Sequence, residues 1–211
     1  MLDILYSDKN IAVILKPAGL ISEDGDSAVS VIPYIREALG CADVFPVHRL
    51  DRETGGVMVY ALDKKSAAEL SAAIQGDKMK KTYLAIVNGK PSEETGTFCD
   101  LLFKDAKKNK SYVVNRERKG VKKASLEYTV QKSLSERTLV RILLHTGRSH
   151  QIRVQFSHRK MPLVGDRRYG DASGVKELCL FATELSFPHP KSGEVMTFSA
   201  LPVGEIWNEF I

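Results

Sequence analysis

The chain has 211 residues, of which 43% are hydrophobic and 27% charged, and its net charge is +5. This composition is ordinary for a globular protein with a buried core, and no apolar run is long enough to cross a bilayer. The N-terminal residues also lack the basic-then-apolar pattern of a secretory signal peptide. We therefore expect one cytoplasmic domain, residues 1–211, with no membrane association.

The first part of the chain combines strands and helices. Residues 4–20 predict two short strands around an Asp-Lys-Asn turn. Residues 27–40 fit a helix that ends at Gly40. Its inward-facing residues are expected to be Val31, Tyr34 or Ile35, and Leu39. Residues 56–62 then predict a buried strand, and residues 63–76 an amphipathic helix that Asp63 caps and Gly76 ends.

After residue 76 the hydrophobic pattern changes to a period of two, which is typical of strands. Strands are predicted at residues 82–89, 111–114, 123–134, 137–146, 179–187 and 194–201. Residues 149–159 fit a short helix with Ser149 as its N-cap. Because strands outnumber helices and do not alternate with them, we expect an α+β fold with a mixed or mostly antiparallel sheet.

The spacing of cysteine and histidine argues against a disulfide framework and a metal site. The cysteine count is odd and no CxxC pair is present, so we expect reduced and mostly buried thiols. They are Cys41, Cys99 and Cys179. His48 with Asp51, and His145 with His150, lack the spacing of four that puts two ligands on one helical face. The sequence predicts no metal, and it has neither a P-loop nor a dinucleotide fingerprint.

The positive charge is concentrated in residues 104–123, which we call the basic segment. It holds nine basic and two acidic residues, a net charge of +7, so the rest of the chain carries −2. A focused basic patch is typical of proteins that bind a polyanion, because neutralised phosphates release condensed counterions. A solvated loop with lysines for solubility is the alternative, and charge alone does not separate the two.

Three short segments combine residues that can carry chemistry. HRLDRETGG, residues 48–56, places Asp51 just before a buried strand, although a polar turn is an equal interpretation. HTGRSHQIR, residues 145–153, places Arg153 beside apolar residues, where a buried guanidinium needs an anion. That anion is a carboxylate in a cleft, a substrate phosphate or a structural ion-pair partner. In KKTYLAIVNGKP, Tyr83 enters a strand, which by itself favours a core residue.

Taken together, these segments resemble the RluA-type family of RNA pseudouridine synthases. The resemblance is carried by HRLDRETGG, KKTYLAIVNGKP, TGRSHQIRVQ and PLVGDRRYG. It extends to both ends of the chain through ILYSDKNIAVILKPAGLIS and TELSFPHPKSGEVMTFSALP. The chain departs from the family pattern in having Gly55 where many members have serine, and Gln155 where many have histidine.

The resemblance implies a pseudouridine synthase fold, with a mixed, mostly antiparallel sheet flanked by helices and a central RNA-binding cleft. It implies an isomerase that breaks the glycosidic bond of a uridine in rRNA or tRNA, turns the uracil and rejoins it through a ring carbon. No cofactor and no obligate protein partner are implied, and we expect a monomer. Longer members carry a separate N-terminal RNA-binding domain, and we expect none here.

The resemblance also assigns roles residue by residue. Asp51 resembles the catalytic aspartate, Tyr83 the active-site tyrosine, and Arg153 the arginine that pairs with the aspartate. Arg49 matches an arginine that holds or replaces the displaced nucleotide. The other expected RNA contacts are His48, Arg148, His150, Lys107, Lys108 and Lys110.

Physical chemistry agrees with these roles. A stacked uridine must be flipped out, at a cost of a few kcal/mol, before its sugar carbon is accessible. Asp51 then attacks the ribose or the base, or removes a sugar proton, and the sequence does not separate these routes. Arg153 keeps the carboxylate charged in a dry site, and Tyr83 stacks on the uracil or takes the proton from its ring carbon.

Two other functions compete with this one. An RNA-binding protein on the same fold that no longer catalyses would be expected to have lost one of Asp51, Tyr83 and Arg153, and all three are present. An N-glycoside hydrolase generally needs two facing carboxylates. A single carboxylate with an arginine and a tyrosine suits isomerisation better, because the base must stay bound and water must stay out.

Overall fold

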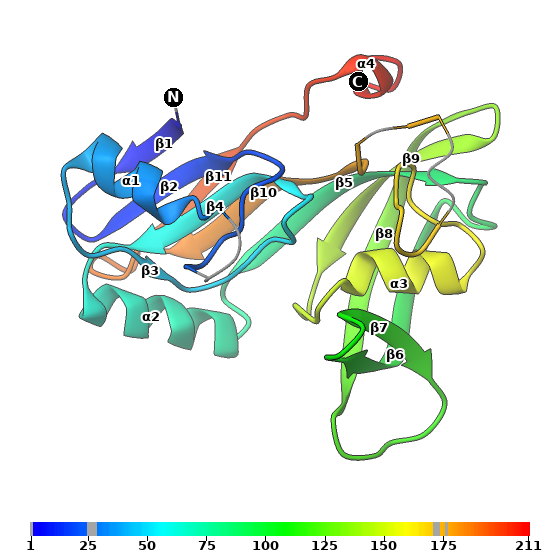
Figure 1. Ribbon diagram of the computed structural model, residues 1–211, viewed down its shortest axis with the longest axis horizontal. Helices are drawn as coiled ribbons and strands as arrows, with labels where there is room; N and C mark the ends of the chain where they lie inside the picture. The colour runs from blue at the N-terminus through cyan, green and yellow to red at the C-terminus, as the bar shows by residue number, and fades with distance from the viewer. Residues whose placement is uncertain (1, 25–28, 171–173, 176) are drawn as a thin grey trace. The chain divides into compact units, whose positions relative to one another are not determined.

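The computed structural model describes residues 2–24, 29–170, 174–175 and 177–211 (Figure 1). The chain forms two compact units. Unit 1 consists of Met1–Lys81 and Phe181–Pro202, and unit 2 of Thr82–Leu180 and Val203–Ile211. Within the described residues, no helix is both long and apolar enough to cross a membrane.

Unit 1 is built on a mixed sheet that contains the predicted N-terminal hairpin. Its strands are β1 (Asp3–Ser7), β2 (Ile11–Lys16), β3 (Phe45–Pro46), β4 (Gly55–Ala61), β10 (Leu180–Pro188) and β11 (Val195–Ser199). The β1–β2, β2–β4, β3–β4 and β10–β11 pairs are antiparallel, and the β4–β10 pair is parallel. Asp8 turns the first hairpin, because its Oδ1 accepts the N–H groups of Asn10 and Ile11. The core beneath β2 and β4 includes Leu70 of a covering helix.

The two helices of unit 1 are α1 (Ile32–Leu39) and α2 (Lys64–Gln75). The caps predicted for α2 are confirmed, since Asp63 Oδ1 accepts the N–H of Ser66 and Gly76 is the C-cap. The predicted start of α1 is wrong, because the helix begins at Ile32. Residues 27–28 of that prediction lie outside the described residues, and 29–31 precede the helix. Ile35 is buried and Tyr34 is exposed, which settles which of them faces inward.

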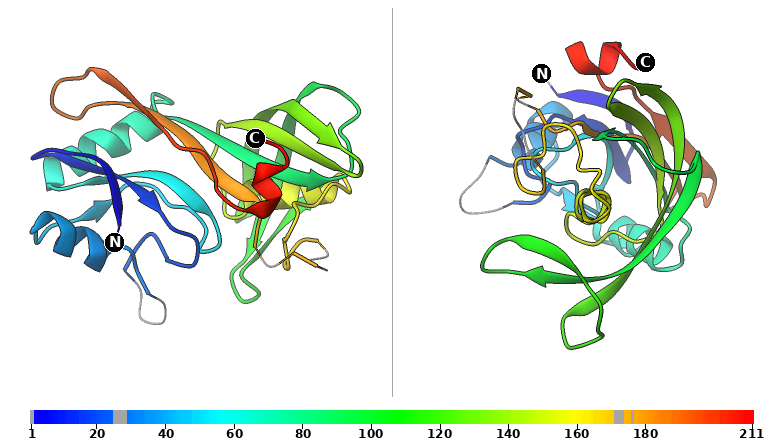
Figure 2. Two further views of the ribbon diagram at one scale, coloured as in Figure 1. Left: turned by 90° about the horizontal axis from the view of Figure 1, so that it is seen from above. Right: turned by 90° about the vertical axis from the view of Figure 1, so that its right-hand side faces the viewer.

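In the described residues, unit 2 consists of an antiparallel sheet and two helices. Its elements are β5 (Lys80–Asn88), β6 (Thr95–Asp105), β7 (Lys110–Val114), β8 (Val121–Leu134), β9 (Arg137–Leu144), α3 (Gln151–His158) and α4 (Glu205–Asn208). Along the sheet, β5 pairs with β9, β9 with β8, β8 with β6 and β6 with β7. Figure 2 shows these strands curving around α3, which is seen end-on in the right-hand view.

All six strands predicted after residue 76 are present, and three further elements were not predicted: β3, β6 and α4. Strand β6 lacks a clean alternation because Asp100 lies on the same side of the strand as buried Phe98 and Leu102. Its carboxylate is satisfied there by Arg159 and Gln155. The α+β class with a mixed, mostly antiparallel sheet is confirmed.

Two other predictions need correction. Ser149 is not the N-cap of α3, because the helix begins at Gln151 after His150, which has φ +53°. The Gln151 side chain organises this turn instead, since its Oε1 accepts the Thr146 hydroxyl and the Arg148 N–H. The cysteines are free, but they are not mostly buried: Cys179 is buried, Cys41 is half-buried and Cys99 is exposed.

Candidate active site

The loop that carries Asp51 is fastened to the loop that follows β2. The N–H of Leu50 donates to Ser22 Oγ (3.0 Å), and the same hydroxyl donates to the Leu50 carbonyl (3.1 Å). On the other side of Asp51, Arg52 Nε donates to the Gly19 carbonyl (2.9 Å), and the Gly19 N–H donates to the Arg52 carbonyl (2.7 Å). The residues before and after Asp51 are therefore both fixed, which restricts where its carboxylate can lie.

A buried lysine supports the loop that follows β2. Lys16 is 1% exposed, and its Nζ donates to the carbonyls of Pro17 and Leu20, both at 2.8 Å. Burial lowers the pKa of Lys16 to about 8, and the negative charge of Asp51 opposes that decrease. Below that pH, Lys16 both closes the loop and places a positive charge in the electrostatic environment of Asp51.

The double glycine after the loop allows a close strand contact. Gly56 has φ +133° and pairs with Ala182 of β10. A Cβ on Gly56 would overlap the Ala182 backbone and would lie 2.6 Å from the Ala182 Cβ. A Cβ on Gly55 would approach only to 3.3 Å from the Lys16 carbonyl. The position that requires glycine is therefore Gly56, which joins the Asp51 loop to the centre of the sheet in unit 1.

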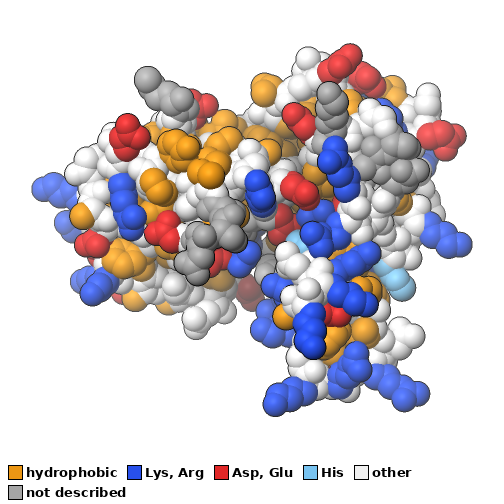
Figure 3. All heavy atoms as spheres, in the orientation of Figure 1, with side chains coloured by type: hydrophobic (Ala, Val, Ile, Leu, Met, Phe, Trp, Pro, Cys, Tyr) orange, Lys and Arg blue, Asp and Glu red, His pale blue; other side chains and the backbone are white. Residues whose placement is uncertain are grey.

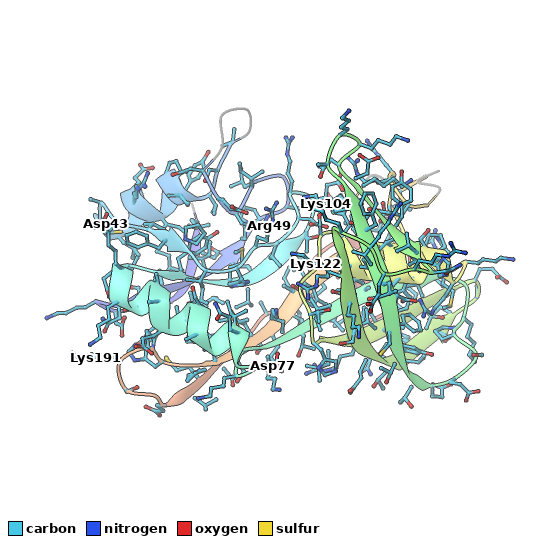
Figure 4. All side chains as sticks on the ribbon, turned by 90° about the horizontal axis from the view of Figure 1, so that it is seen from below. Asp43, Arg49, Asp77, Lys104, Lys122 and Lys191 are labelled. Carbon is cyan, nitrogen blue, oxygen red and sulfur yellow. The ribbon has the colours of Figure 1, made fainter. Side chains whose placement is uncertain are left out.

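The two residues that start the motif have different surroundings. His48 is bound to β4, since its Nε2 accepts the N–H of Val59 (3.2 Å), and burial lowers its pKa to about 3. The ring is neutral at physiological pH, so the RNA contact predicted for His48 would not involve a charge. Figure 4 labels Arg49. Its side chain is 68% exposed, and its Nη1 lies 2.6 Å from Oε1 of Glu23. Both RNA-binding roles stay predictions.

In unit 2, the anion predicted for buried Arg153 is the carboxylate of Asp166. Arg153 is 2% exposed, and its Nε and Nη2 donate to Oδ2 and Oδ1 of Asp166, both at 2.8 Å. Burial alone would raise the pKa of Asp166, but the hydrogen bonds and charge of Arg153 reverse the direction and hold it below its usual value. Sequence reasoning missed Asp166 as a site residue, although a buried guanidinium requires such a partner.

Tyr169, three residues after Asp166, connects Arg153 with the basic segment. Its hydroxyl accepts the N–H of Ser111 (2.7 Å) and forms a hydrogen bond with Nδ1 of His150 (2.9 Å). Its ring lies 5.5 Å from the guanidinium carbon of Arg153 and 5.1 Å from Nζ of Lys110. The predicted site residues His150, Arg153 and Lys110 thus meet around one tyrosine that the sequence did not single out.

Half of the basic segment lies in strands, and the other half forms the turns that connect them. It covers the end of β6, all of β7 and the start of β8. Lys107 and Lys108 are exposed at the turn between β6 and β7, and Arg168 Nη1 holds that turn against the loop after α3 by donating to the Lys108 carbonyl (3.2 Å). Arg148 is exposed beside β8, where its Nε donates to the Lys123 carbonyl. Figure 3 shows lysine and arginine side chains gathered over β6 and β7.

The third catalytic prediction, Tyr83, lies on β5, where it is 6% exposed and opposite Ile142 of β9. Asp51 is in unit 1, whereas Tyr83 and Arg153 are in unit 2. The structure thus brings Arg153 together with Asp166, and Asp51 together with the loop after β2. That Asp51, Tyr83 and Arg153 act on one substrate stays a prediction. Among the described residues, no group of three or more histidine, cysteine or acidic side chains is arranged to hold a metal ion.

Comparison with known proteins identifies the class. Residues 10–158 match the family model described as RNA pseudouridylate synthase. A tRNA pseudouridine synthase C of Pasteurella multocida is 32% identical over 100% of this chain and 95% of its own length. A dual-specificity RNA pseudouridine synthase RluA of Haemophilus ducreyi is 35% identical over 95% of this chain and 93% of its own length. The chain belongs to the RNA pseudouridylate synthase family, and it is an isomerase that acts on uridine in RNA.

The fold agrees with this assignment. The solved structure of human RNA pseudouridylate synthase domain containing 4 superposes with a TM-score of 0.80 at 26% sequence identity. The match covers 98% of this chain and 90% of that one. The resemblance drawn from the motifs, to the RluA-type family and to its fold, is confirmed.

Proposed function

We propose that this enzyme converts one or more specific uridines of rRNA or tRNA to pseudouridine, with Asp51 as the catalytic carboxylate. The names of its relatives support both RNA classes. The Pasteurella multocida relative is named for tRNA. A relative from Buchnera aphidicola, 33% identical over 93% of this chain and 66% of its own length, is a ribosomal large subunit pseudouridine synthase C.

The observation that carries the proposal is the double attachment of the Asp51 loop. Ser22 binds Leu50 and Gly19 binds Arg52, so the backbone on both sides of Asp51 is fixed before substrate arrives. A surface carboxylate with no chemical task does not need such positioning, whereas a reacting group must be held close to its productive geometry. Each route requires an ionised carboxylate at Asp51, and the charge of Lys16 interacts with that of Asp51.

The reaction is an isomerisation, so no redox partner or cofactor is required. The bond from the ribose C1′ to N1 of uracil breaks, the uracil turns, a bond from C1′ to C5 forms, and the C5 proton is lost to a base while N1 regains a proton. We assign the acceptance of the C5 proton to Tyr83. We assign to the exposed guanidinium of Arg49 the role of filling the space that the flipped nucleotide leaves. For Asp51, nucleophilic attack and proton removal remain alternative routes.

We assign Arg153 the role of balancing the negative charge of Asp51 when the two units act on the same uridine. A guanidinium has five N–H donors, so binding Asp166 through Nε and Nη2 is compatible with a second carboxylate. The RNA-binding roles of His48, Arg148, His150 and the basic segment belong to the same proposal. That the two units form a single catalytic domain, and that the enzyme is a cytoplasmic monomer, also stay predictions.

The test is mass spectrometry of rRNA and tRNA from cells that lack this protein, after a reagent that tags pseudouridine. We expect one or a few tagged sites to disappear, to return with the wild-type protein, and to stay absent with Asp51→Asn. Asp43→Asn is the matched control, because Asp43 is an exposed aspartate of the same unit (Figure 4). Full restoration by Asp51→Asn would reject the catalytic role of Asp51. Unchanged tagging in the deletion strain would reject rRNA and tRNA as substrates.

A further inference from the structure

The three-stranded ribbon of β7, β6 and β8 has one face that is not used by the core of unit 2. On the inner face, Leu102, Ala124 and Val154 of α3 form a hydrophobic cluster. Side chains alternate along a strand, so the neighbours of Leu102 point to the opposite side. We call this side the outer face. It is formed by Leu101, Phe103, Asp105, Lys110, Tyr112, Val114, Val121 and Lys123.

The register of the ribbon aligns the outer-face residues in rows. Phe103 pairs with Tyr112 on one side and with Val121 on the other. Leu101 pairs with Val114 and with Lys123 in the same way. Tyr112 is 37% exposed although it is a large aromatic residue, and it lies beside Lys110, whose Nζ is 5.9 Å from its ring centre. The outer face thus presents aromatic and aliphatic surface with cations at its margin.

A cavity opens on this face. It has a volume of about 460 Å³, and it is lined by Leu101, Glu117, Arg118, Val121 and Lys123. The guanidinium of Arg118 lies over the ring of Phe103, with its central carbon 4.7 Å from the ring centre. One wall is therefore a planar cation on an aromatic ring, and the floor is aliphatic. Glu117 is only 3.6 Å from Lys123, but both side chains are largely exposed, so this ion pair is weak.

We propose that the outer face binds an unpaired stretch of the substrate RNA, with one base stacked on Tyr112 or against Arg118 in the cavity. The inference rests on the proposed function, because it takes RNA as the substrate, and it adds a second RNA contact away from Asp51. Charge complementarity supports this occupant, since most of the outer face belongs to the basic segment, which has a net charge of +7. Sheet faces with exposed aromatic residues and flanking cations stack single-stranded bases. Paired bases in an A-form duplex are not available for such stacking.

Photo-crosslinking tests the contact directly. The probe is a single-stranded RNA that carries 5-iodocytidine, which leaves the uridines of the RNA unmodified. After irradiation of the full-length protein with this RNA, we expect the crosslinked peptide to contain Tyr112. The same RNA annealed to its complement should give a much weaker crosslink at that peptide. Equal crosslinking of the duplex, or a crosslink elsewhere alone, would overturn the proposal.

Substitutions separate stacking from charge. Tyr112→Ala should weaken binding of the single-stranded probe about tenfold, and Tyr112→Phe should bind like the wild type. Tyr34→Ala is the matched control, because Tyr34 is 45% exposed on α1 of the other unit. Arg118→Lys keeps the charge but loses the planar group, so it should also weaken binding. If Tyr112→Ala binds the probe as well as Tyr112→Phe does, the outer face has no stacking role.

The result of the crosslinking experiment does not depend on the catalytic role proposed for Asp51. Asp51→Asn should keep the Tyr112 crosslink whatever its effect on isomerisation, so failure of the proposed catalytic role leaves the crosslink intact. Poly-glutamate and anionic lipid vesicles serve as competitors, to test whether another polyanion binds the outer face instead of RNA. We expect unlabelled single-stranded RNA to displace the probe at a much lower charge concentration than either of them. Equal displacement by poly-glutamate or by the vesicles would overturn the assignment to RNA.

Discussion

Arg153 and Asp166 form a two-point ion pair in the interior of unit 2, with both N–O distances at 2.8 Å. Asp166 Oδ1 also accepts the N–H groups of Arg168 and Tyr169. The carboxylate is thereby fixed by the turn that follows it, and it fixes the plane of the guanidinium in its turn. Asp166 is therefore a positioning residue for Arg153 in the proposed active site.

Asp166→Asn should destabilise the protein by about 3 kcal/mol, because it removes the carboxylate that binds the buried guanidinium at two points. Urea unfolding measures this change. Asp100→Asn is the matched control, since the Asp100–Arg159 pair is partly exposed, with the Arg159 side chain 28% exposed, and its loss should cost much less. The double variant Asp166→Asn/Arg153→Met should be more stable than Asp166→Asn alone. A double variant that is less stable than the single one would contradict a dominant ion-pair effect.

Much of the fold follows from the sequence where one face of a strand is buried. Strand β8 alternates between inward residues such as Leu126 and outward ones such as Glu127, so its period is visible in the sequence. Strand β6 was missed because inward-facing Asp100 breaks that pattern, and its partner Arg159 is 59 residues away along the chain. Local patterns do not contain such distant contacts.

In the candidate site, too, local motifs were visible in the sequence and distant contacts were not. The motifs predict Asp51, Tyr83 and Arg153 as site residues, because their residue types and order are specific. The residues that position them were not predicted: Ser22 is 28 residues from Leu50 along the chain, and Asp166 is 13 residues from Arg153. A serine hydroxyl that binds a backbone N–H and carbonyl of another loop has no signature in the sequence, since only the fold brings the two loops together.

Ser22→Ala should reduce kcat with little change in KM. The substitution removes both hydrogen bonds to Leu50, so the backbone before Asp51 gains freedom, and displacement of a reacting group by about 1 Å can cost up to ~100-fold in rate. We expect a decrease in kcat of about tenfold and a loss of stability of about 1–2 kcal/mol. Steady-state kinetics on the RNA identified by mass spectrometry measures the first, and urea unfolding the second.

Ser71→Ala is the control for that variant, because the Ser71 hydroxyl donates only to the Ala67 carbonyl of its own helix in the hydrogen bonds of the described residues. It should leave both kinetic constants unchanged. A Ser22→Ala enzyme with wild-type kcat would show that the Ser22 bonds stabilise the loop without positioning Asp51.

Gly56→Ala and Gly55→Ala should differ strongly although the two positions are adjacent. At Gly56 an added Cβ meets the Ala182 backbone, and the residue has φ +133°, which L side chains rarely adopt. We expect a loss of several kcal/mol or failure to fold. At Gly55 the nearest atom is 3.3 Å away, so a small adjustment suffices and the loss should stay below about 1 kcal/mol. Thermal unfolding of both variants measures the difference, and equal melting temperatures would contradict it.

The stability of the protein should fall in acid partly through His48. Burial lowers its folded-state pKa to about 3, against 6.5 for an exposed histidine, so between these pH values the unfolded chain binds a proton that the folded chain does not. The contribution of neutral His48 to the free energy of unfolding is therefore fully present above pH 6.5, and it is lost as pH falls toward 3. Between pH 7 and 4.5 the wild type should lose about 2 kcal/mol more than His48→Gln.

Urea unfolding of the wild type and His48→Gln at both pH values measures this difference, and the carboxylates common to both proteins cancel in the comparison. Glutamine retains an oxygen that can accept the N–H of Val59, so the variant should fold. Parallel losses in the two proteins would show that the His48 ring is protonated in the folded state.

Charge reversal at Lys107, Lys108 and Lys110 should weaken RNA binding and flatten its dependence on salt. Each phosphate contact contributes a slope of about −0.7 to −0.9 in a plot of log affinity against log salt concentration, so loss of three contacts should flatten the slope by about 2 to 3. The control reverses three exposed lysines of unit 1 with the same change in net charge: Lys65, Lys78 and Lys191. Fluorescence anisotropy at several salt concentrations measures both slopes. Equal slopes in the two triple variants would mean that these lysines act through net charge alone, whereas a flatter slope only in the first would place phosphates at the turn between β6 and β7.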